Sequence, residues 1–167
     1  MTDFISIDPK TLKDNVFSVI DDEWMLVTAG DKNGFNTMTA SWGGLGILWF
    51  KNVSFIFVRP GRYTYEFMEK HDTYTLSFLG DEHRDILTYC GKMSGRNVDK
   101  IKETGLTPVF DNNSVYFNQS RMVMVCRKLY HQDIDPKNFL DPAIHDAYPN
   151  KDYHRMYVGE ITDLLMK

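Results

Sequence analysis

The chain has 167 residues, of which 43% are hydrophobic, and a formal net charge of −4. The length predicts a single domain over residues 1–167, and the acidic balance argues against a nucleic-acid-binding protein, which relies on a basic surface. The longest strongly apolar run, 45–50, is far too short to span a bilayer. The chain has two cysteines, and its first residues do not show the basic segment followed by an apolar run that is typical of a secretory signal peptide. We therefore expect both cysteines to be free thiols in the reducing cytoplasm.

The first part of the chain predicts strands joined by tight turns. Asp8-Pro9 predicts the cap and first position of a short helix that runs to about Asn15. Alternating side chains predict a strand over 23–30, and the Asn-Gly turn that follows predicts a return strand over 35–41. A run rich in Val, Ile and Phe predicts a strand over 52–59 that is buried on both faces.

The remainder of the chain alternates short helices with further strands. The pattern predicts a helix over 62–70, a half-buried strand over 73–79, and a helix capped by Asp81 that reaches residue 89 or 90. A short helix over 98–104 is expected to end at Gly105. Further strands are predicted over 107–110, 115–117 and 121–130. The segment 153–165 is predicted to begin as a strand. Because strands and helices do not alternate as they do in βαβ units, these elements predict a mostly β fold, a largely antiparallel barrel with short helices.

Several common chemistries are excluded by their missing motifs. The glycines at 43–46 have the wrong spacing for a dinucleotide fingerprint, and the sequence contains neither a P-loop nor a nucleophile elbow. The five histidines are scattered, so we expect no metal site. No CxxC pair is present, which excludes a rubredoxin-type iron site.

The start of the helix predicted over 62–70 has the features of an anion site. Gly61 and Arg62 enter the helix, where free backbone N–H groups favour an anion. Arg59, Arg62 and the Thr64 hydroxyl add donors, and Lys100 could bring further positive charge. The alternative is that these basic residues are ordinary surface charges.

The stretch 36–42 is unusually polar for a strand that otherwise reads as buried. Its polar side chains need partners, which either a ligand or cross-strand hydrogen bonds would supply. Trp42 precedes two glycines, where a planar ligand could approach the backbone, although a core position for this ring is equally consistent with the pattern. These polar residues are Asn36, Thr37, Thr39 and Ser41.

Four blocks together resemble the flavin reductase-like family, most closely its flavoredoxin-like branch. The blocks are NTMTASWG (36–43), VRPGRYTYEF (58–67), CGKMSGRNVDK (90–100) and DYHRMYVGEI (152–161). The resemblance covers about residues 24–161. It implies an FMN-binding split β-barrel that forms a homodimer, with FMN at or near the subunit interface.

The same resemblance implies a set of FMN-binding residues. Those expected along the ring and ribityl chain are Asn36, Thr39, Ser41 and Trp42, with Thr37 and Met38 in the same cofactor site. Those expected at the phosphate are Arg59, Arg62, Tyr63, Thr64 and Lys100. His154 is expected to approach the site from the last strand, and Cys90 is expected to be a structural thiol.

Three functions are consistent with such a site. In the first, NADH or NADPH passes hydride to N5 of FMN, a step that requires no catalytic acid or base from the protein, and the electrons go to a separate acceptor protein or to free flavin. The second is an electron carrier without a nicotinamide site. The third is a non-catalytic flavin-binding protein.

Overall fold

The computed structural model describes residues 3–167 and contains one sheet of eight strands and a separate hairpin. The strands of the large sheet are β1 (Ile5–Ile7), β2 (Met25–Asp31), β3 (Gly34–Ala40), β4 (Gly43–Leu48), β5 (Lys51–Val58), β6 (Thr73–Phe78), β9 (Met122–Asp133) and β10 (Arg155–Met166). Their order is β3-β2-β6-β9-β10-β5-β4, with β1 on β10, and every pair is antiparallel. The hairpin consists of β7 (Pro108–Asp111) and β8 (Ser114–Phe117).

The sheet curls so that its two edge strands meet. Only Ser41 and Trp42 separate the end of β3 from the start of β4, although these strands lie at opposite ends of the strand order. At Gly43 a Cβ atom would lie 2.7 Å from the Phe55 carbonyl oxygen on β5 and 3.3 Å from the Met25 methyl group on β2. The edges touch here without pairing, which gives a split barrel and confirms the predicted antiparallel architecture.

Two large apolar clusters and a smaller third one stabilise this arrangement in the described part of the chain. The barrel interior is filled by side chains from six strands, including Val27, Met38, Ile56, Met124 and Tyr157, all less than 5% exposed. A second cluster lies on the outer face, where Leu26 and Phe117 pack with Leu79, Leu87, Cys90 and Leu106. The alternation predicted for β2 therefore holds, but both of its faces are buried.

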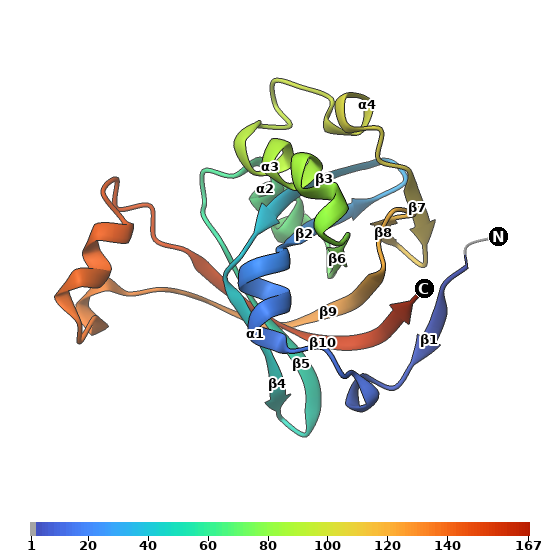
Figure 1. The fold of residues 1–167 in the computed structure, drawn as a ribbon. Coiled ribbons are helices and arrows are strands. Elements are labelled where there is room, and N and C mark those ends of the chain that lie inside the picture. Colours follow the sequence, from blue (N-terminus) through green and yellow to red (C-terminus); the bar gives the residue numbers. More distant parts are fainter. Residues whose placement is uncertain (1–2) are drawn as a thin grey trace.

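The helices lie outside the barrel. They are α1 (Val16–Ser18), α2 (Tyr63–Lys70), α3 (Arg84–Lys92) and α4 (Lys100–Thr104). Figure 1 shows α3 beside β3, and it shows the segment 134–154, drawn in orange between β9 and β10, projecting away from the barrel. We call this segment the arm; it contains the 3-10 turns Pro136–Asn138 and Pro142–Ala147. No helix among residues 3–167 is long and apolar enough to cross a membrane.

Three local predictions were wrong and one strand was missed, each for a tertiary reason or a weak local signal. Asp8 does cap a turn, but it is a 3-10 turn that ends at Thr11 rather than a helix to residue 15. The strand β6 is buried on both faces because the β7–β8 hairpin covers it, and Thr75 donates a hydrogen bond to the Val115 carbonyl oxygen at 2.5 Å. Asp81 does not act as a cap; Gly80, at φ 87°, precedes the 3-10 turn that leads into α3. The glycine-rich strand β4 was not predicted at all.

Candidate functional site

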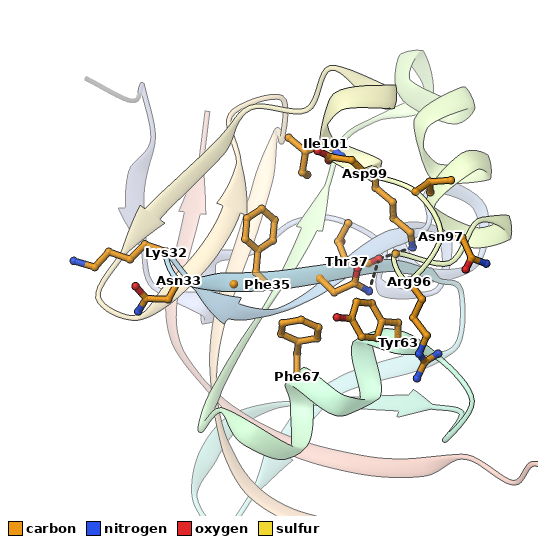
Figure 2. A pocket seen from close by; sticks show the side chains of 15 residues that line it. Lys32, Asn33, Phe35, Thr37, Tyr63, Phe67, Arg96, Asn97, Asp99 and Ile101 are labelled. Atoms are coloured by element: carbon orange, nitrogen blue, oxygen red, sulfur yellow. Dashed lines mark hydrogen bonds between the residues drawn. The ribbon is translucent and has the colours of Figure 1, made fainter.

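Three cavities lie next to one another along β3 and α2. The first, of about 200 Å³ and here named the Trp42 cavity, is lined by Met38, Thr39, Ala40, Ser41, Trp42, Phe57, Arg59, Arg62 and His154. The second, of about 60 Å³ and named the Lys100 cavity, is lined by Asn36, Gly61, Arg62, Tyr63, Thr64, Lys92, Met93, Ser94, Gly95 and Lys100. The third, of about 630 Å³ and named the Phe67 cavity, involves Tyr63, Phe67 and residues 32–37 and 95–101 (Figure 2). Because Arg62 lines both of the first two cavities, they form a continuous surface.

Lys100 is a buried cation at the centre of this region. Its side chain begins at the first residue of α4 and is fixed by two carbonyl oxygens, with Nζ 2.7 Å from that of Thr37 and 2.9 Å from that of Cys90. The residue is 5% exposed, and burial lowers the pKa of its ammonium group to about 8. An ammonium group has three donors, so one remains for a ligand in the cavity. The interpretation of Lys100 as a surface charge is therefore wrong.

Arg62 is the second cation of the Lys100 cavity. Its guanidinium donates to the carbonyl oxygens of Gly91 at 2.7 Å and Cys90 at 3.3 Å, so the loop after α3 holds it in place. Burial lowers the pKa of this group, but an arginine stays protonated near neutral pH. Arg62 is also the N-cap residue of α2, and no side chain caps the first turn. The N–H groups at this helix start therefore add to the positive potential of the two side chains.

Neutral groups complete the donor set of the Lys100 cavity. The Asn36 amide donates to the Thr64 hydroxyl oxygen at 2.7 Å, which leaves the Thr64 proton free to donate elsewhere. A Cβ atom at Gly61 would meet no atom within 4 Å, so the backbone there is open to a ligand. A Cβ atom at Gly95 would overlap the Asn36 amide oxygen, so only glycine allows this close approach. The cavity suits a small anion by its size, charge and donors.

The Trp42 cavity is larger and more aromatic than the Lys100 cavity. Trp42 is 50% exposed, which excludes the core position that the sequence left open. Its ring centroid lies 5.2 Å from that of His154, whose Nδ1 is 2.8 Å from the Tyr148 hydroxyl of the arm. Burial, together with the nearby Arg59 charge, lowers the pKa of His154 to about 4, so its imidazole is neutral at pH 7. The walls can accommodate a planar ring.

Arg59 anchors the arm to the barrel beside this cavity. Its guanidinium lies 2.8 Å from the Asp152 carboxylate and 2.9 Å from the Ala147 carbonyl oxygen. It also lies 4.9 Å from the centre of the Tyr148 ring. Arg59 therefore lines the Trp42 cavity and not the Lys100 cavity, where the phosphate was expected.

Two of the predicted threonines, one buried and one partly buried, already have protein partners. The hydroxyl groups of Thr37 and Thr28 are 2.8 Å apart across β2 and β3, which is the cross-strand alternative left open by the sequence. Thr39 donates to the Leu87 carbonyl oxygen of α3 at 2.5 Å. The binding roles predicted for both residues stay predictions.

The structure gathers the predicted residues into two neighbouring groups. Met38, Thr39, Ser41, Trp42, Arg59, Arg62 and His154 lie at the Trp42 cavity. Asn36, Arg62, Tyr63, Thr64 and Lys100 lie at the Lys100 cavity. Thr37 lines the Phe67 cavity.

Sequence reasoning missed Phe57 as a residue of the Trp42 cavity and Tyr148 as the partner of His154. Phe57 is one of several apolar residues in a strand that is hydrophobic on both faces, so no local signal distinguishes it. Tyr148 lies in the irregular arm, and its position depends on Arg59 and His154. No group of three or more His, Cys, Asp or Glu side chains in the described part of the chain could hold a metal ion, and both cysteines are free and buried.

The comparisons with known proteins give the family and the fold. The flavin reductase-like domain model matches residues 20–167. A flavoredoxin of Desulfovibrio vulgaris (Miyazaki F) is similar in structure, with TM-score 0.68 and 22% identity over 98% of this chain and 76% of that one. An FMN-binding domain of a flavin reductase-like enzyme from Shewanella baltica OS155 gives TM-score 0.69 and 11% identity over 99% and 78%.

A third similar structure is the NADH:FAD oxidoreductase of Streptomyces globisporus C-1027, with TM-score 0.64 and 13% identity over 87% of this chain and 75% of that one. At these identities the structures establish the fold alone. The comparison with curated proteins gave no match. The family model nevertheless spans most of the sequence, including every residue of the three cavities. The chain therefore belongs to the flavin reductase-like domain family.

Proposed function

We propose that this protein binds FMN, with the phosphate in the Lys100 cavity and the ring in the Trp42 cavity. The observation that carries the proposal is the continuity of the two cavities through Arg62, with two fixed cations at one end and aromatic walls at the other. Lys100, Arg62 and the Thr64 hydroxyl would hold the phosphate, because charge-assisted hydrogen bonds to an oxyanion are the strong ones. When bound, FMN supplies a redox-active ring that accepts hydride from NADH or NADPH and passes electrons to a separate acceptor protein or free flavin.

The side chains around the Trp42 cavity would bind and orient the flavin ring and would not themselves react. His154 is neutral and engaged with Tyr148, so it supplies no charged acid at neutral pH. Phe57 and Trp42 offer apolar surface to a ring. The half-exposed Trp42 leaves this site accessible from solvent, as a second substrate would require. The proposed task of the protein is therefore binding and orientation.

An anaerobic stopped-flow assay tests the proposed activity. Purified protein reconstituted with FMN is mixed with NADH or NADPH while the visible flavin absorption is followed, and bleaching is expected with at least one nucleotide. Bleaching with neither nucleotide would favour the electron carrier or the non-catalytic protein. If FMN titration leaves flavin fluorescence unchanged, the whole site assignment is wrong. Dialysis then separates a tightly bound prosthetic group from an exchanged substrate.

Because the charge of Lys100 changes with pH, we expect the affinity for FMN to depend on pH. Raising the pH from 7 to 9 deprotonates an ammonium group whose pKa is about 8, so FMN affinity should fall roughly tenfold if the bound state keeps the proton. Riboflavin has no phosphate, and its affinity should change little. The Lys100→Arg variant should flatten the FMN profile because arginine keeps its proton. Equal pH dependence for FMN and riboflavin would contradict a role for Lys100 at the phosphate.

We propose in addition that the protein acts as a homodimer in the cytoplasm. Large apolar side chains are exposed on the β4–β5 hairpin and on the arm, including Ile47, Phe50 and Leu140, which supports association of this surface. The two free, buried cysteines are consistent with a reducing compartment. Sedimentation velocity on the FMN-loaded protein checks the dimer; a monomer at micromolar concentration would contradict it.

A further inference from the structure

The two ring nitrogens of His154 have different surroundings at the Trp42 cavity. Nδ1 is 2.8 Å from the Tyr148 hydroxyl oxygen, whereas Nε2 has no hydrogen-bond partner among the described residues. In the same part of the chain, the buried side-chain polar atoms that lack a partner are Ser77 Oγ and Ser120 Oγ. His154 Nε2 is not one of them, so this nitrogen keeps accessible surface. A ligand in the cavity can therefore form a hydrogen bond with it.

The Tyr148 hydroxyl determines which nitrogen of His154 carries the proton. A neutral imidazole has one N–H group and one acceptor nitrogen, and a hydroxyl group donates one proton. If Nδ1 carried the proton, the hydroxyl proton of Tyr148 would have no acceptor, in a residue that is only 6% exposed. If Nε2 carries the proton, the hydroxyl donates to Nδ1 and both groups are satisfied. Because buried polar groups are rarely left unpaired, the Nε2–H tautomer is the stable one.

The charges around His154 keep its imidazole neutral. Burial is the main cause that lowers the pKa of this group to about 4, and the positive charge of Arg59 acts in the same direction. Asp152 has the opposite effect on the pKa, but its carboxylate is paired with the Arg59 guanidinium at 2.8 Å. At pH 7 the ring therefore offers the cavity an N–H donor without a net charge.

The arm holds Tyr148 in place through its backbone and its ring. Tyr148 follows the 3-10 turn Pro142–Ala147, and its N–H group donates to a carbonyl oxygen of that turn at 3.0 Å. Its ring centroid lies 6.0 Å from that of Phe139 and 5.0 Å from that of Tyr153, both in the arm. None of these contacts uses the hydroxyl group, whose hydrogen-bond partner among the described residues is His154. A phenylalanine at this position would keep the packing and lose only that bond.

We propose that Tyr148 is a positioning residue: its hydroxyl donates to His154 Nδ1 and so presents Nε2–H to the Trp42 cavity as a fixed, uncharged hydrogen-bond donor. The ligand that this donor fits is a planar heteroaromatic ring with an acceptor oxygen or nitrogen at its edge. The identification of that ring as a flavin rests on the proposed function, whereas the tautomer is a property of the protein alone. Tyr148 does not line the cavity, so it acts on the ring only through His154.

Heteronuclear NMR of ligand-free protein labelled at the histidine nitrogens tests the tautomer. At pH 7 the imidazole of His154 is expected to carry its proton on Nε2, with Nδ1 as an unprotonated, hydrogen-bonded nitrogen. The His154→Phe variant identifies the signal, because that signal alone is lost from those of the five histidines. A proton on Nδ1, or a doubly protonated ring at pH 7, overturns the proposal.

Titration with riboflavin tests the effect on the ring, because riboflavin has no phosphate to bind in the Lys100 cavity. His154→Phe keeps an aromatic ring but removes the donor, and riboflavin affinity is expected to fall about three- to tenfold, as for one neutral hydrogen bond. Tyr148→Phe should lower the affinity by no more than this factor. It should also shift the visible absorption maximum of the bound flavin in the same direction as His154→Phe.

Tyr153→Phe is the matched control for Tyr148→Phe. It removes a hydroxyl group from the same aromatic cluster of the arm, and the Tyr153 hydroxyl forms no hydrogen bond with the described residues. The variant should keep the wild-type riboflavin affinity and absorption maximum. Losses of equal size in Tyr153→Phe and Tyr148→Phe would show a general effect of the arm and overturn the proposal.

A double-mutant cycle separates positioning from a structural role of Tyr148. In the His154→Phe background, Tyr148→Phe should cause no further loss, because the hydroxyl acts through His154. Additive losses, or wild-type affinity and absorption in Tyr148→Phe, overturn the proposal. If circular dichroism shows that Tyr148→Phe does not fold, the tautomer in the wild-type protein decides. If the wild-type protein binds no flavin, the proposed function is overturned, and the NMR result still decides whether Tyr148 sets the tautomer.

Discussion

The double variant Arg62→Ala, Thr64→Ala is expected to bind FMN about 100-fold more weakly than the wild-type protein. Arg62 is held at the Lys100 cavity by the Gly91 and Cys90 carbonyl oxygens, and the Thr64 hydroxyl keeps its proton free because it accepts from Asn36. Hydrogen bonds to charged groups contribute about 1.5–3 kcal/mol each, so the loss of both donors costs roughly 3 kcal/mol of binding free energy. Fluorescence titration with FMN measures the change.

Two controls separate phosphate binding from a general effect on the fold. Riboflavin, which has no phosphate, should bind the double variant and the wild-type protein with similar affinity. The matched pair Arg127→Ala, Thr162→Ala removes the same residue types from β9 and β10, where they contact Glu160 and the Val125 carbonyl oxygen outside the three cavities. It should keep wild-type FMN affinity. Equal losses for FMN and riboflavin, or no loss for FMN, would place the phosphate elsewhere.

The Gly159→Ala variant is expected to lose about 3 kcal/mol or more of unfolding free energy. Gly159 lies on β10 between Ser54 of β5 and Lys128 of β9, and a Cβ atom there would overlap the Tyr74 hydroxyl and lie 2.7 Å from its Cζ. Tyr74 is 1% exposed and bonds Ser54 at 2.7 Å, so it has no room to retreat without breaking a buried hydrogen bond. Overpacking and a lost buried hydrogen bond each cost about 1–3 kcal/mol.

Urea unfolding compares this variant with a matched strand glycine. At Gly44 a Cβ atom would meet only Phe55 Cδ2, at 3.8 Å, so Gly44→Ala should be neutral or slightly stabilising. The second change Tyr74→Phe should restore part of the loss in Gly159→Ala because it removes the overlapping oxygen. Equal unfolding free energies for Gly159→Ala and Gly44→Ala would show that Tyr74 moves aside freely.

Local sequence patterns predicted the secondary structure best where one residue type has one strong structural effect. Gly105 ends α4 in the left-handed conformation at φ 70°, as expected for a glycine after a helix. The run of Val, Ile and Phe forms β5, in which no residue is exposed, because β-branched and aromatic residues suit a covered strand. The strand β4 escaped prediction because its glycines carry no such signal, and its position depends on closure of the barrel against Phe55.

The sequence pattern predicted the kind of residues at the proposed anion site but not which of them line the same cavity. Arg62 and Thr64 are at a helix start, which a sequence pattern can reveal. Arg59, three residues earlier, faces the arm and Asp152 instead, a contact across 93 positions of sequence. Lys100 reaches the same cavity only because α4 packs near α3 and β3, where the Cys90 and Thr37 carbonyl oxygens accept its protons.

The sequence by itself determined the class of fold, the family resemblance and the residue types of the site, because strand alternation, turn residues and the four motif blocks are local properties. Only the tertiary structure decided which of those residues share a cavity. Burial and hydrogen bonding between distant segments made Lys100 a fixed cation, turned Arg59 toward the arm, and left Trp42 half exposed. They also placed the Phe67 cavity beside the Lys100 cavity.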